Sequence, residues 1–143
     1  MVKIGIGLRF PGTCEQAFMF YQSVFGGELF MLQRFKEMKE HGYTIEPQDE
    51  EKIAFVGLKV RDEVVFGGDD DSKSFPRELI IGNNISLGVN LESKAEADRI
   101  YNALSAGATD KSPMADMYWG EYTGSFKDKF GIWWGVSYQR PRE

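Results

Sequence analysis

The stretch TCEQAFMFYQSVFGG, Thr13–Gly27, is typical of one amphipathic helix with its own start and stop signals. Thr13 and Gln16 have the spacing of a capping box, in which the two side chains hydrogen-bond to the first free backbone N–H groups. The pair Gly26–Gly27 is a stop signal, because glycine readily leaves the helical conformation. The stretch therefore predicts a helix over residues 13–25.

A second stretch, SKAEADRIYNALSAGA, repeats this organisation 80 residues later. Ser93 and Glu96 have the capping-box spacing, and Gly107 supplies the stop, so we expect a helix over residues 93–106. The apolar faces of the two helices match at the same offset and have the spacing of a helix that lies on a sheet. Ala17, Phe20, Tyr21 and Val24 correspond to Ala97, Ile100, Tyr101 and Leu104.

Segments with strand-like alternation flank both helices in the same order, which indicates an internal repeat. The first half contains KIGIGLRF (3–10), ELFMLQRF (28–35), KIAFVGLKV (52–60) and EVVFGGD (63–69), and the second half contains NISLGVNL (84–91), MADMYWG (114–120), GSFKDKF (124–130) and IWWGVSYQ (132–139). Each half is therefore a predicted βαβββ module of an α+β protein, with first strands that begin near Lys3 and Asn84. We expect one domain over residues 1–143, with modules at 1–70 and 82–143.

Composition narrows the function classes. The chain has 143 residues and a net charge of −5, without a basic cluster, so we expect no nucleic-acid partner. Cys14 is the single cysteine, which excludes an intrachain disulfide and a thiolate metal cluster. The N-terminus lacks a basic start followed by an apolar run, and no segment reaches the ~18 consecutive apolar residues of a membrane span. These features predict a cytoplasmic protein without a membrane partner.

The strand alternation also predicts two different sheet faces. One face is apolar in every strand and is covered by the helices. The other face carries glycines, a few polar side chains and two cations, which leaves room for a small molecule. Its members other than the glycines are Arg9, Phe55, Lys59, Ser86, Asn90, Trp133 and Ser137.

The repeated βαβββ module resembles the vicinal oxygen chelate superfamily, the fold of glyoxalase I, extradiol dioxygenases and bleomycin-resistance proteins. The beginning, PGTCEQAFMFYQSVFGGEL, and the end, ADMYWGEYTGSFKDKFGIWWGVSY, are similar to its PhnB-like branch. The resemblance implies two modules that form a curved mixed sheet around a concave cavity. It also implies homodimers, because relatives often pair modules between chains to cover open strand edges.

Metal-binding members of the superfamily carry four ligands in that cavity, two from each module. Mapped onto this chain, the ligand positions hold Gly5, Gly57, Asn84 and Gly135. Three glycines and one amide do not form a divalent-cation site, since such sites need several oxygens, imidazoles or thiolates. The single histidine, His41, lies in a charged connection. We therefore expect no metal and no cofactor.

The candidate ligand-binding residues are those that remain on the glycine-bearing face together with one turn aromatic. They are Arg9, Phe55, Lys59, Asn84, Ser86, Asn90, Trp119 and Trp133. Arg9 and Lys59 suit an anionic group, with solvation at strand ends as the alternative. Phe55 and Trp133 suit a planar group, while both Trp119 and Trp133 also suit core or interface packing.

Three functions stay open at this point. The first is a metal-free protein that binds a small, partly planar molecule in its cavity. The second is a metal-independent enzyme in which a carboxylate such as Asp116 acts on a bound substrate, the alternative for Asp116 being a solvated turn. The third is a protein that acts only through association, with its cavity filled by its own aromatic residues. PhnB-like proteins also carry a demethylubiquinone methyltransferase label, but nothing in this sequence supports the parallel sheet and glycine-rich loop that a methyltransferase needs.

Substitution of the glycines separates a pocket from a filled interior. A leucine in place of Gly57 or Gly135 abolishes ligand binding at modest cost in stability if the face is open. The same leucine overpacks the site if aromatic side chains already occupy the space.

Overall fold

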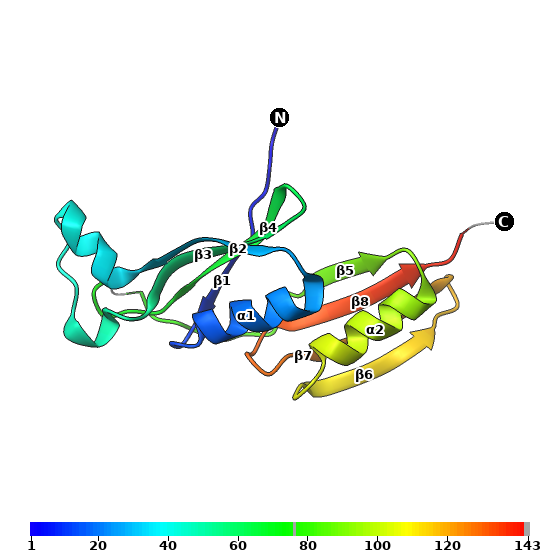
Figure 1. Ribbon diagram of the computed structural model, residues 1–143. Coiled ribbons are helices and arrows are strands. Elements are labelled where there is room, and N and C mark those ends of the chain that lie inside the picture. Colours follow the sequence, from blue (N-terminus) through cyan, green and yellow to red (C-terminus); the bar gives the residue numbers. More distant parts are fainter. Residues whose placement is uncertain (76, 142–143) are drawn as a thin grey trace. The chain divides into compact units, whose positions relative to one another are not determined.

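The computed structural model describes residues 1–75 and 77–141, and the chain divides into two compact units, Met1–Ile80 and Ile81–Glu143. The first unit contains β1 (Gly7–Phe10), α1 (Cys14–Phe25), β2 (Glu28–Arg34), β3 (Ile53–Val60) and β4 (Glu63–Asp70) (Figure 1). The second contains β5 (Leu87–Leu91), α2 (Lys94–Leu104), β6 (Thr109–Asp116), β7 (Glu121–Lys127) and β8 (Trp133–Gln139). Both units have the order βαβββ, so the predicted α+β repeat is confirmed.

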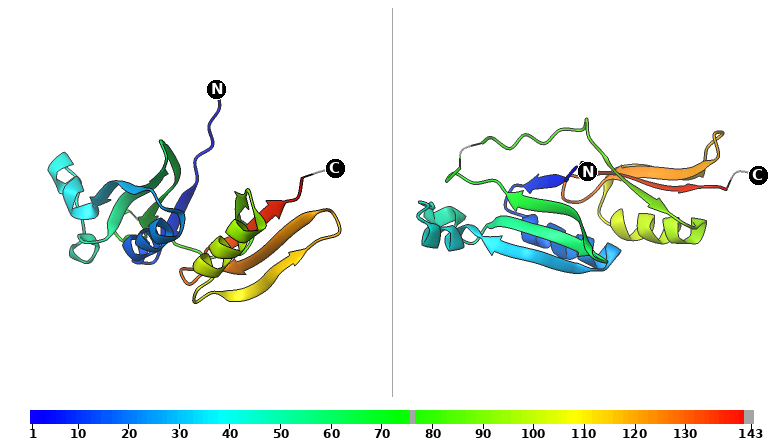
Figure 2. Two further views of the ribbon diagram at one scale, coloured as in Figure 1. Left: turned by 45° about the vertical axis from the view of Figure 1, so that its right-hand side comes forward. Right: turned by 90° about the horizontal axis from the view of Figure 1, so that it is seen from above.

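The two sheets have the same strand order. It is β1-β4-β3-β2 in the first unit and β5-β8-β7-β6 in the second. In each sheet the first strand of the module is parallel to the last, and the remaining pairs are antiparallel. The strands thus form two four-stranded mixed sheets, each with a helix on one face (Figure 2).

The helices begin and end within two residues of their predicted bounds, but only one of the two predicted N-cap side chains makes its capping hydrogen bond. The Ser93 hydroxyl accepts a hydrogen bond of 3.1 Å from the backbone N–H of Glu96, as expected. The side chain of Thr13 makes no capping bond, so that prediction is wrong. A carboxylate from the far end of the module takes this place, because Asp70 accepts from the backbone N–H of Cys14. The long-range acceptor replaces the local one.

Aromatic side chains form the core of the first unit. Phe18, and not Phe20, completes the buried face of α1, while Phe20 is half-buried. The Phe18 ring makes edge-on contacts with Phe10 and Phe66, at centroid distances of 6.2 and 5.5 Å. A Cβ atom on Gly68 would lie 2.3 Å from this ring, so β4 needs glycine there. The side of the sheet on which Gly68 lies is therefore the helix-covered side.

The core of the second unit lies between α2 and its sheet. The predicted face of α2, Ala97, Ile100, Tyr101 and Leu104, is buried, together with Phe126, Trp134 and Val136. Tyr101 meets Phe126 edge to face at 5.3 Å, and its hydroxyl donates to the backbone carbonyl of Ser112 at 3.1 Å. The aromatic body is thus packed while its polar end is satisfied.

Strand boundaries differ from the predictions at three places. β1 and β5 begin at Gly7 and Leu87, later than Lys3 and Asn84. Pairing of β1 begins only where the N–H of Gly67 donates to the carbonyl of Ile6, at 2.8 Å. In the second unit the segment expected as a strand at 114–120 contains a turn.

That turn reverses the chain between β6 and β7. The N–H of Met117 donates to the carbonyl of Glu121 at 2.7 Å, and Gly120 has a φ of 91°. Because this conformation suits glycine, the hairpin closes here, and β7 begins three residues earlier than expected.

The long connection between β2 and β3 contains two short 3-10 helices, Phe35–His41 and Pro47–Asp49, which Figure 2 shows projecting from one end of the first sheet. Asp49 is fully buried and ties this connection to the segment that follows β4. Its carboxylate accepts hydrogen bonds from the Ser74 hydroxyl at 2.7 Å and from the backbone N–H groups of Ser74 and Lys73. Burial opposes ionisation of Asp49, but hydrogen bonds from Ser74, Lys52 and Lys73 outweigh it and lower the pKa of the carboxyl. Residues 72–75 are therefore held in place beside the sheet.

Within the described parts of the chain, no helix has the length and hydropathy to cross a bilayer. The cytoplasmic location stays a prediction.

Candidate functional site

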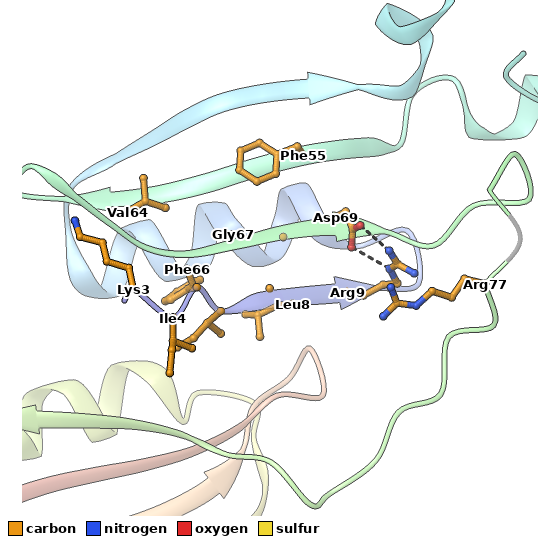
Figure 3. Close-up of a pocket in the computed structure, with 14 residues that line it drawn as sticks. Lys3, Ile4, Leu8, Arg9, Phe55, Val64, Phe66, Gly67, Asp69 and Arg77 are labelled. Carbon is orange, nitrogen blue, oxygen red and sulfur yellow. Dashed lines mark hydrogen bonds and ion pairs between the residues drawn. The ribbon is translucent and has the colours of Figure 1, made fainter. Parts of the chain in front are cut away.

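The first unit contains a cavity of about 620 Å³ beside β1, the edge strand of its sheet (Figure 3). Its lining includes Phe55 and Gly67 from the face that α1 does not cover, and also Phe66 and Gly68 from the other face. The volume lies within the range of small-molecule sites, roughly 300–1,000 Å³. Its walls come from the segment before β1, from β1, β3 and β4, and from Arg77. The lining residues are Lys3, Ile4, Gly5, Ile6, Gly7, Leu8, Arg9, Phe55, Val64, Phe66, Gly67, Gly68, Asp69 and Arg77.

Glycine backbone forms much of the cavity floor. A Cβ atom on Gly5 or Gly7 would meet no atom within 4 Å, so these positions border open space. At Gly67 a Cβ atom would lie 3.1 Å from the ring of Phe55. Phe55 therefore lies directly over the glycine, and 38% of its surface stays exposed toward the cavity side of the sheet. This part of the predicted bare face is open, as expected for a pocket.

Arg9 and Asp69 form the polar end of the cavity. The two residues are opposite each other in the parallel pair of β1 and β4. Arg9 Nε lies 3.0 Å from Asp69 Oδ1, and Nη2 lies 2.8 Å from Oδ2, so the ion pair is bidentate. The hydrogen bond to Asp69 raises the pKa of Arg9. Arg9 is thus neither the unpaired cation nor the solvated strand end that the sequence suggested.

Gly57 and Lys59, on β3, are less open than predicted. A Cβ atom on Gly57 would lie 3.2 Å from Val64 and 3.6 Å from Phe30, so the protein's own side chains cover this glycine. Lys59 Nζ lies 5.6 Å from the centre of the Phe30 ring, and Lys59 is not among the residues that line the cavity. Lys59 therefore does not line the cavity in which it was predicted to contact an anionic group.

The second unit has its own smaller cavity, of about 280 Å³. Three predicted residues, Asn84, Ser86 and Trp133, line it together with Gly135, where a Cβ atom would meet nothing within 4 Å. The lining residues are Asn83, Asn84, Ile85, Ser86, Ser125, Trp133, Trp134 and Gly135. Lys127 Nζ lies 5.9 Å from the Trp133 ring. The second unit thus places an indole ring and amide groups around an open glycine.

Besides Lys59, two more of the predicted residues lie outside both cavities. Asn90 is exposed on β5, where it pairs in register with Ser137. Trp119 lies in the turn between β6 and β7, beside Tyr118, with ring centres 4.9 Å apart. It belongs to a hairpin tip rather than to a sheet face, and its side chain is 54% exposed.

The mapped metal positions do not fit a metal. Gly5 and Gly135 offer no side-chain ligand, and Gly57 is covered by apolar groups. Across residues 1–75 and 77–141, no group of three or more His, Cys, Asp or Glu side chains is placed to hold an ion. The donor set thus offers neither the oxygens nor the imidazoles that a divalent cation needs.

The carboxylate suggested for catalysis is engaged elsewhere. Asp116 lies at the end of β6 and forms ion pairs with Lys94 at 3.3 Å and Arg140 at 2.6 Å. Cys14 is buried, and burial, helped by nearby carboxylates, raises the pKa of its thiol. The thiol is therefore not the activated nucleophile that a helix start can produce.

Sequence reasoning missed three charged residues of the first cavity, Lys3, Asp69 and Arg77. Asp69 has the same parity as Gly67 in the stretch EVVFGGD, but the sequence analysis assigned no residue of this strand to a face and nothing local paired Asp69 with Arg9. Arg77 lies in the segment between the modules, for which the alternation pattern made no prediction. The pairing of Asp69 with Arg9 could be identified only from the register of β1 against β4.

Comparisons with known proteins agree with this architecture. The family model described as 3-demethylubiquinone-9 3-methyltransferase matches residues 2–137. The crystal structure of protein PA1353 from Pseudomonas aeruginosa is similar, with a TM-score of 0.80 and 32% identity over 99% of this chain and 100% of that one. A putative 3-demethylubiquinone-9 3-methyltransferase, PhnB protein, from Bacillus cereus has a TM-score of 0.76 and 22% identity over 96% and 99% of the two chains.

A more distant structure shares the fold that the sequence analysis predicted. The glyoxylase/bleomycin resistance protein/dioxygenase domain from Frankia sp. EAN1pec has a TM-score of 0.66 at 11% identity, over 100% of this chain and 96% of that one. At that identity the likeness concerns the fold. The family model that matches residues 2–137 shows that this protein belongs to the family described as 3-demethylubiquinone-9 3-methyltransferase, and its two βαβββ modules have the fold of glyoxalase/bleomycin resistance proteins.

Proposed function

We propose that this protein is a metal-free member of its family that binds a small, partly planar molecule in the cavity of its first unit. The observation that carries the proposal is the make-up of that cavity. Glycine backbone at Gly5 and Gly7 leaves its floor open, Phe55 offers an aromatic surface, and the Arg9–Asp69 pair supplies one polar end. An apolar hollow with a few converging polar groups is the usual form of a small-molecule site.

Binding has more support than catalysis in these residues. Asp116 is paired with two cations, and the Cys14 thiol is buried, so neither is a free base or nucleophile. A metal-independent enzyme stays an alternative, as does a protein that acts only by association. Methyl transfer is not part of the proposal, because the glycines of the cavity lie in and before a strand rather than in a loop that opens a helix.

A thermal-shift screen tests the proposal, with purified protein, planar aromatic compounds and a panel of divalent metals. A ligand that binds only the native state raises the melting midpoint by mass action. We expect at least one planar compound to raise the midpoint and no transition metal to do so. Elemental analysis of protein purified without chelator should show substoichiometric zinc, nickel and iron, and a full equivalent that survives dialysis contradicts the metal-free proposal.

The variant Gly7→Leu locates the site. Its side chain would project into open space, so we expect unchanged or slightly higher stability, together with loss of the ligand-induced shift. The control is Gly88→Leu, whose side chain would also project into open space, but in the second unit. Gly12 is not suitable for a control because its φ of 87° disfavours any other residue. Equal ligand shifts in Gly7→Leu, Gly88→Leu and the parent would refute a site in the first cavity.

We infer further that the protein forms a homodimer. β1 is an edge strand, and the segment before it exposes Val2 and Ile4, whose surfaces are 89% and 90% accessible. Open strand edges with apolar side chains are usually paired or covered. Analytical ultracentrifugation at micromolar concentration should show a dimer, with Ile4→Glu shifting the equilibrium toward monomer, and a parent that stays monomeric at every concentration contradicts this inference.

A further inference from the structure

Arg77 is a charged residue of the first cavity that, like Lys3, forms no ion pair among the described residues. It follows β4 and the segment held by Asp49, and it lines the cavity together with Arg9 and Asp69. Figure 3 shows its side chain extending toward the Arg9–Asp69 pair. Three cations, Lys3, Arg9 and Arg77, and one carboxylate, Asp69, therefore line this cavity, in a protein whose net charge is −5.

Two carboxylates that follow Asp69 in the chain have partners outside the cavity. Asp70 is buried and accepts hydrogen bonds from the backbone N–H groups of Cys14 and Ile53. Asp71 lies 3.7 Å from the ammonium of Lys52, which also contacts Asp49 at 3.4 Å. Among the residues that line the cavity, three cations therefore stand against one carboxylate.

The two arginines of the cavity differ in how many N–H donors remain available to a ligand. Arg9 uses Nε and Nη2, one edge of its guanidinium, for the bidentate bond to Asp69. Arg77 has its whole guanidinium available among the described residues. A planar guanidinium with a free edge matches a carboxylate in a two-bond geometry. The neighbouring Asp69 carboxylate disfavours a dianion such as a phosphate monoester, because like charges repel at short range.

We propose that the ligand of this cavity is an aromatic carboxylic acid, whose carboxylate is bound by Arg77 while its ring lies against Phe55. The inference rests on the proposed binding function and names its ligand class and its anion-binding residue. Asp69 positions Arg9 beside the carboxylate without competing for the Arg77 edge. Lys3 lies by Val64, away from Arg9 and Arg77 in Figure 3, and takes no part in binding the carboxylate.

The residues just before Arg77 in the chain are fixed by contacts with the rest of the first unit. Phe75, two positions before Arg77, lies between aromatic rings, stacked on Phe35 at 5.9 Å and edge-on to Tyr43 at 5.8 Å. Ser74 is bound to the buried Asp49. Because these contacts fix the chain just upstream, the anion-binding arginine starts from an ordered segment rather than from a free linker.

Calorimetric titration with 2-naphthoate, 2-naphthamide and 2-naphthyl phosphate tests the proposal. We expect the parent to bind the carboxylate at least tenfold more tightly than the amide, with affinity that falls as salt rises. Arg77→Gln should weaken naphthoate binding by roughly tenfold or more and leave the amide unchanged, while Arg77→Lys, which keeps the charge but loses the planar edge, falls between them. The control is Arg99→Gln, an exposed arginine of α2.

The possible results separate the two proposals. Equal affinity for naphthoate and naphthamide, or an unchanged affinity of Arg77→Gln for naphthoate, overturns the Arg77 assignment and leaves the binding function standing. Tighter binding of the phosphate than of the carboxylate overturns the ligand class. If the parent binds none of the three probes, the carboxylate proposal is wrong, and the binding function itself fails only if the wider thermal-shift screen also finds no planar ligand.

Discussion

The carboxylate of Asp70 accepts a hydrogen bond of 2.9 Å from the backbone N–H of Cys14, across 56 positions of sequence. Its second oxygen accepts from the N–H of Ile53, also at 2.9 Å. One side chain at the end of β4 thus ties together the start of α1 and the start of β3, and it does for α1 what Ser93 does locally for α2. Three elements of the first unit meet at this buried acid.

Replacement of Asp70 should therefore destabilise the first unit. Asp70→Ala leaves two buried N–H groups without acceptors, at about 1–3 kcal/mol each, so we expect a loss of roughly 2–5 kcal/mol in the free energy of unfolding. Asp70→Asn keeps one acceptor oxygen and should lose less. Urea unfolding at neutral pH measures both, and an alanine variant as stable as the parent contradicts the capping role.

The raised pKa of Asp70 also predicts that the free energy of unfolding depends on pH. Burial raises the pKa of its carboxyl above the ordinary value of 3.8, although backbone hydrogen bonds oppose the rise. The unfolded chain then ionises first, so this group lowers stability as pH rises from that ordinary value through the raised folded pKa. The stability of the parent minus that of Asp70→Asn should decrease over this window and level off above it. A difference that grows with pH would show that the carboxyl is ionised more easily in the folded state.

Asp49 should show the opposite sign. Burial disfavours its charged form, but bonds from Ser74, Lys52 and Lys73 outweigh that effect and lower its pKa below the ordinary 3.8. Its stabilisation is present above 3.8 and is lost as pH falls through the folded pKa. We expect Asp49→Asn to cost about 1–3 kcal/mol at neutral pH, with a gap to the parent that closes in acid. Asp62→Asn, in the turn between β3 and β4, is the control, and an equal effect of both variants contradicts the assignment.

The glycines of the two sheets should respond differently to the same substitution. Gly57→Leu must displace Val64 and Phe30, so we expect a loss of about 1–3 kcal/mol. Gly135→Leu meets open space and should change the free energy of unfolding little. Thermal and urea unfolding of the two variants compares them directly. Equal losses would show that both faces are filled.

The Cys14 thiol should be inert in the native protein. It is fully buried, and burial raises the pKa of the thiol, so little thiolate forms at neutral pH. A colorimetric thiol reagent should react only as fast as the first unit opens, and at once in denaturant. A Ser23→Cys variant adds an exposed thiol on the same helix and should react immediately. Fast labelling of the parent would contradict burial.

Local sequence signals determined much of this protein. The repeat at an offset of 80, the two helices and the order of most strands follow from periodicity and from glycine stop signals, because each depends on residues within one turn or a few positions along a strand. The alternation in KIGIGLRF also placed Gly5, Gly7 and Arg9 on the open face. It did not identify Phe18 as the buried residue of α1, since that choice depends on the space left above Gly68.

Contacts between distant segments decided the candidate site, and alternation along one strand carries no information about them. The parallel register of β1 and β4 sets Arg9 against Asp69, which changes Arg9 from a free cation into half of an ion pair. The pairing of β2 with β3 brings Phe30 over Gly57 and closes a position that looked open. The cavity brings Arg77, from a segment without periodicity, beside that ion pair. Parity tells which face a side chain occupies, but only the register between strands and the path of the connecting segments decide which neighbours it meets there.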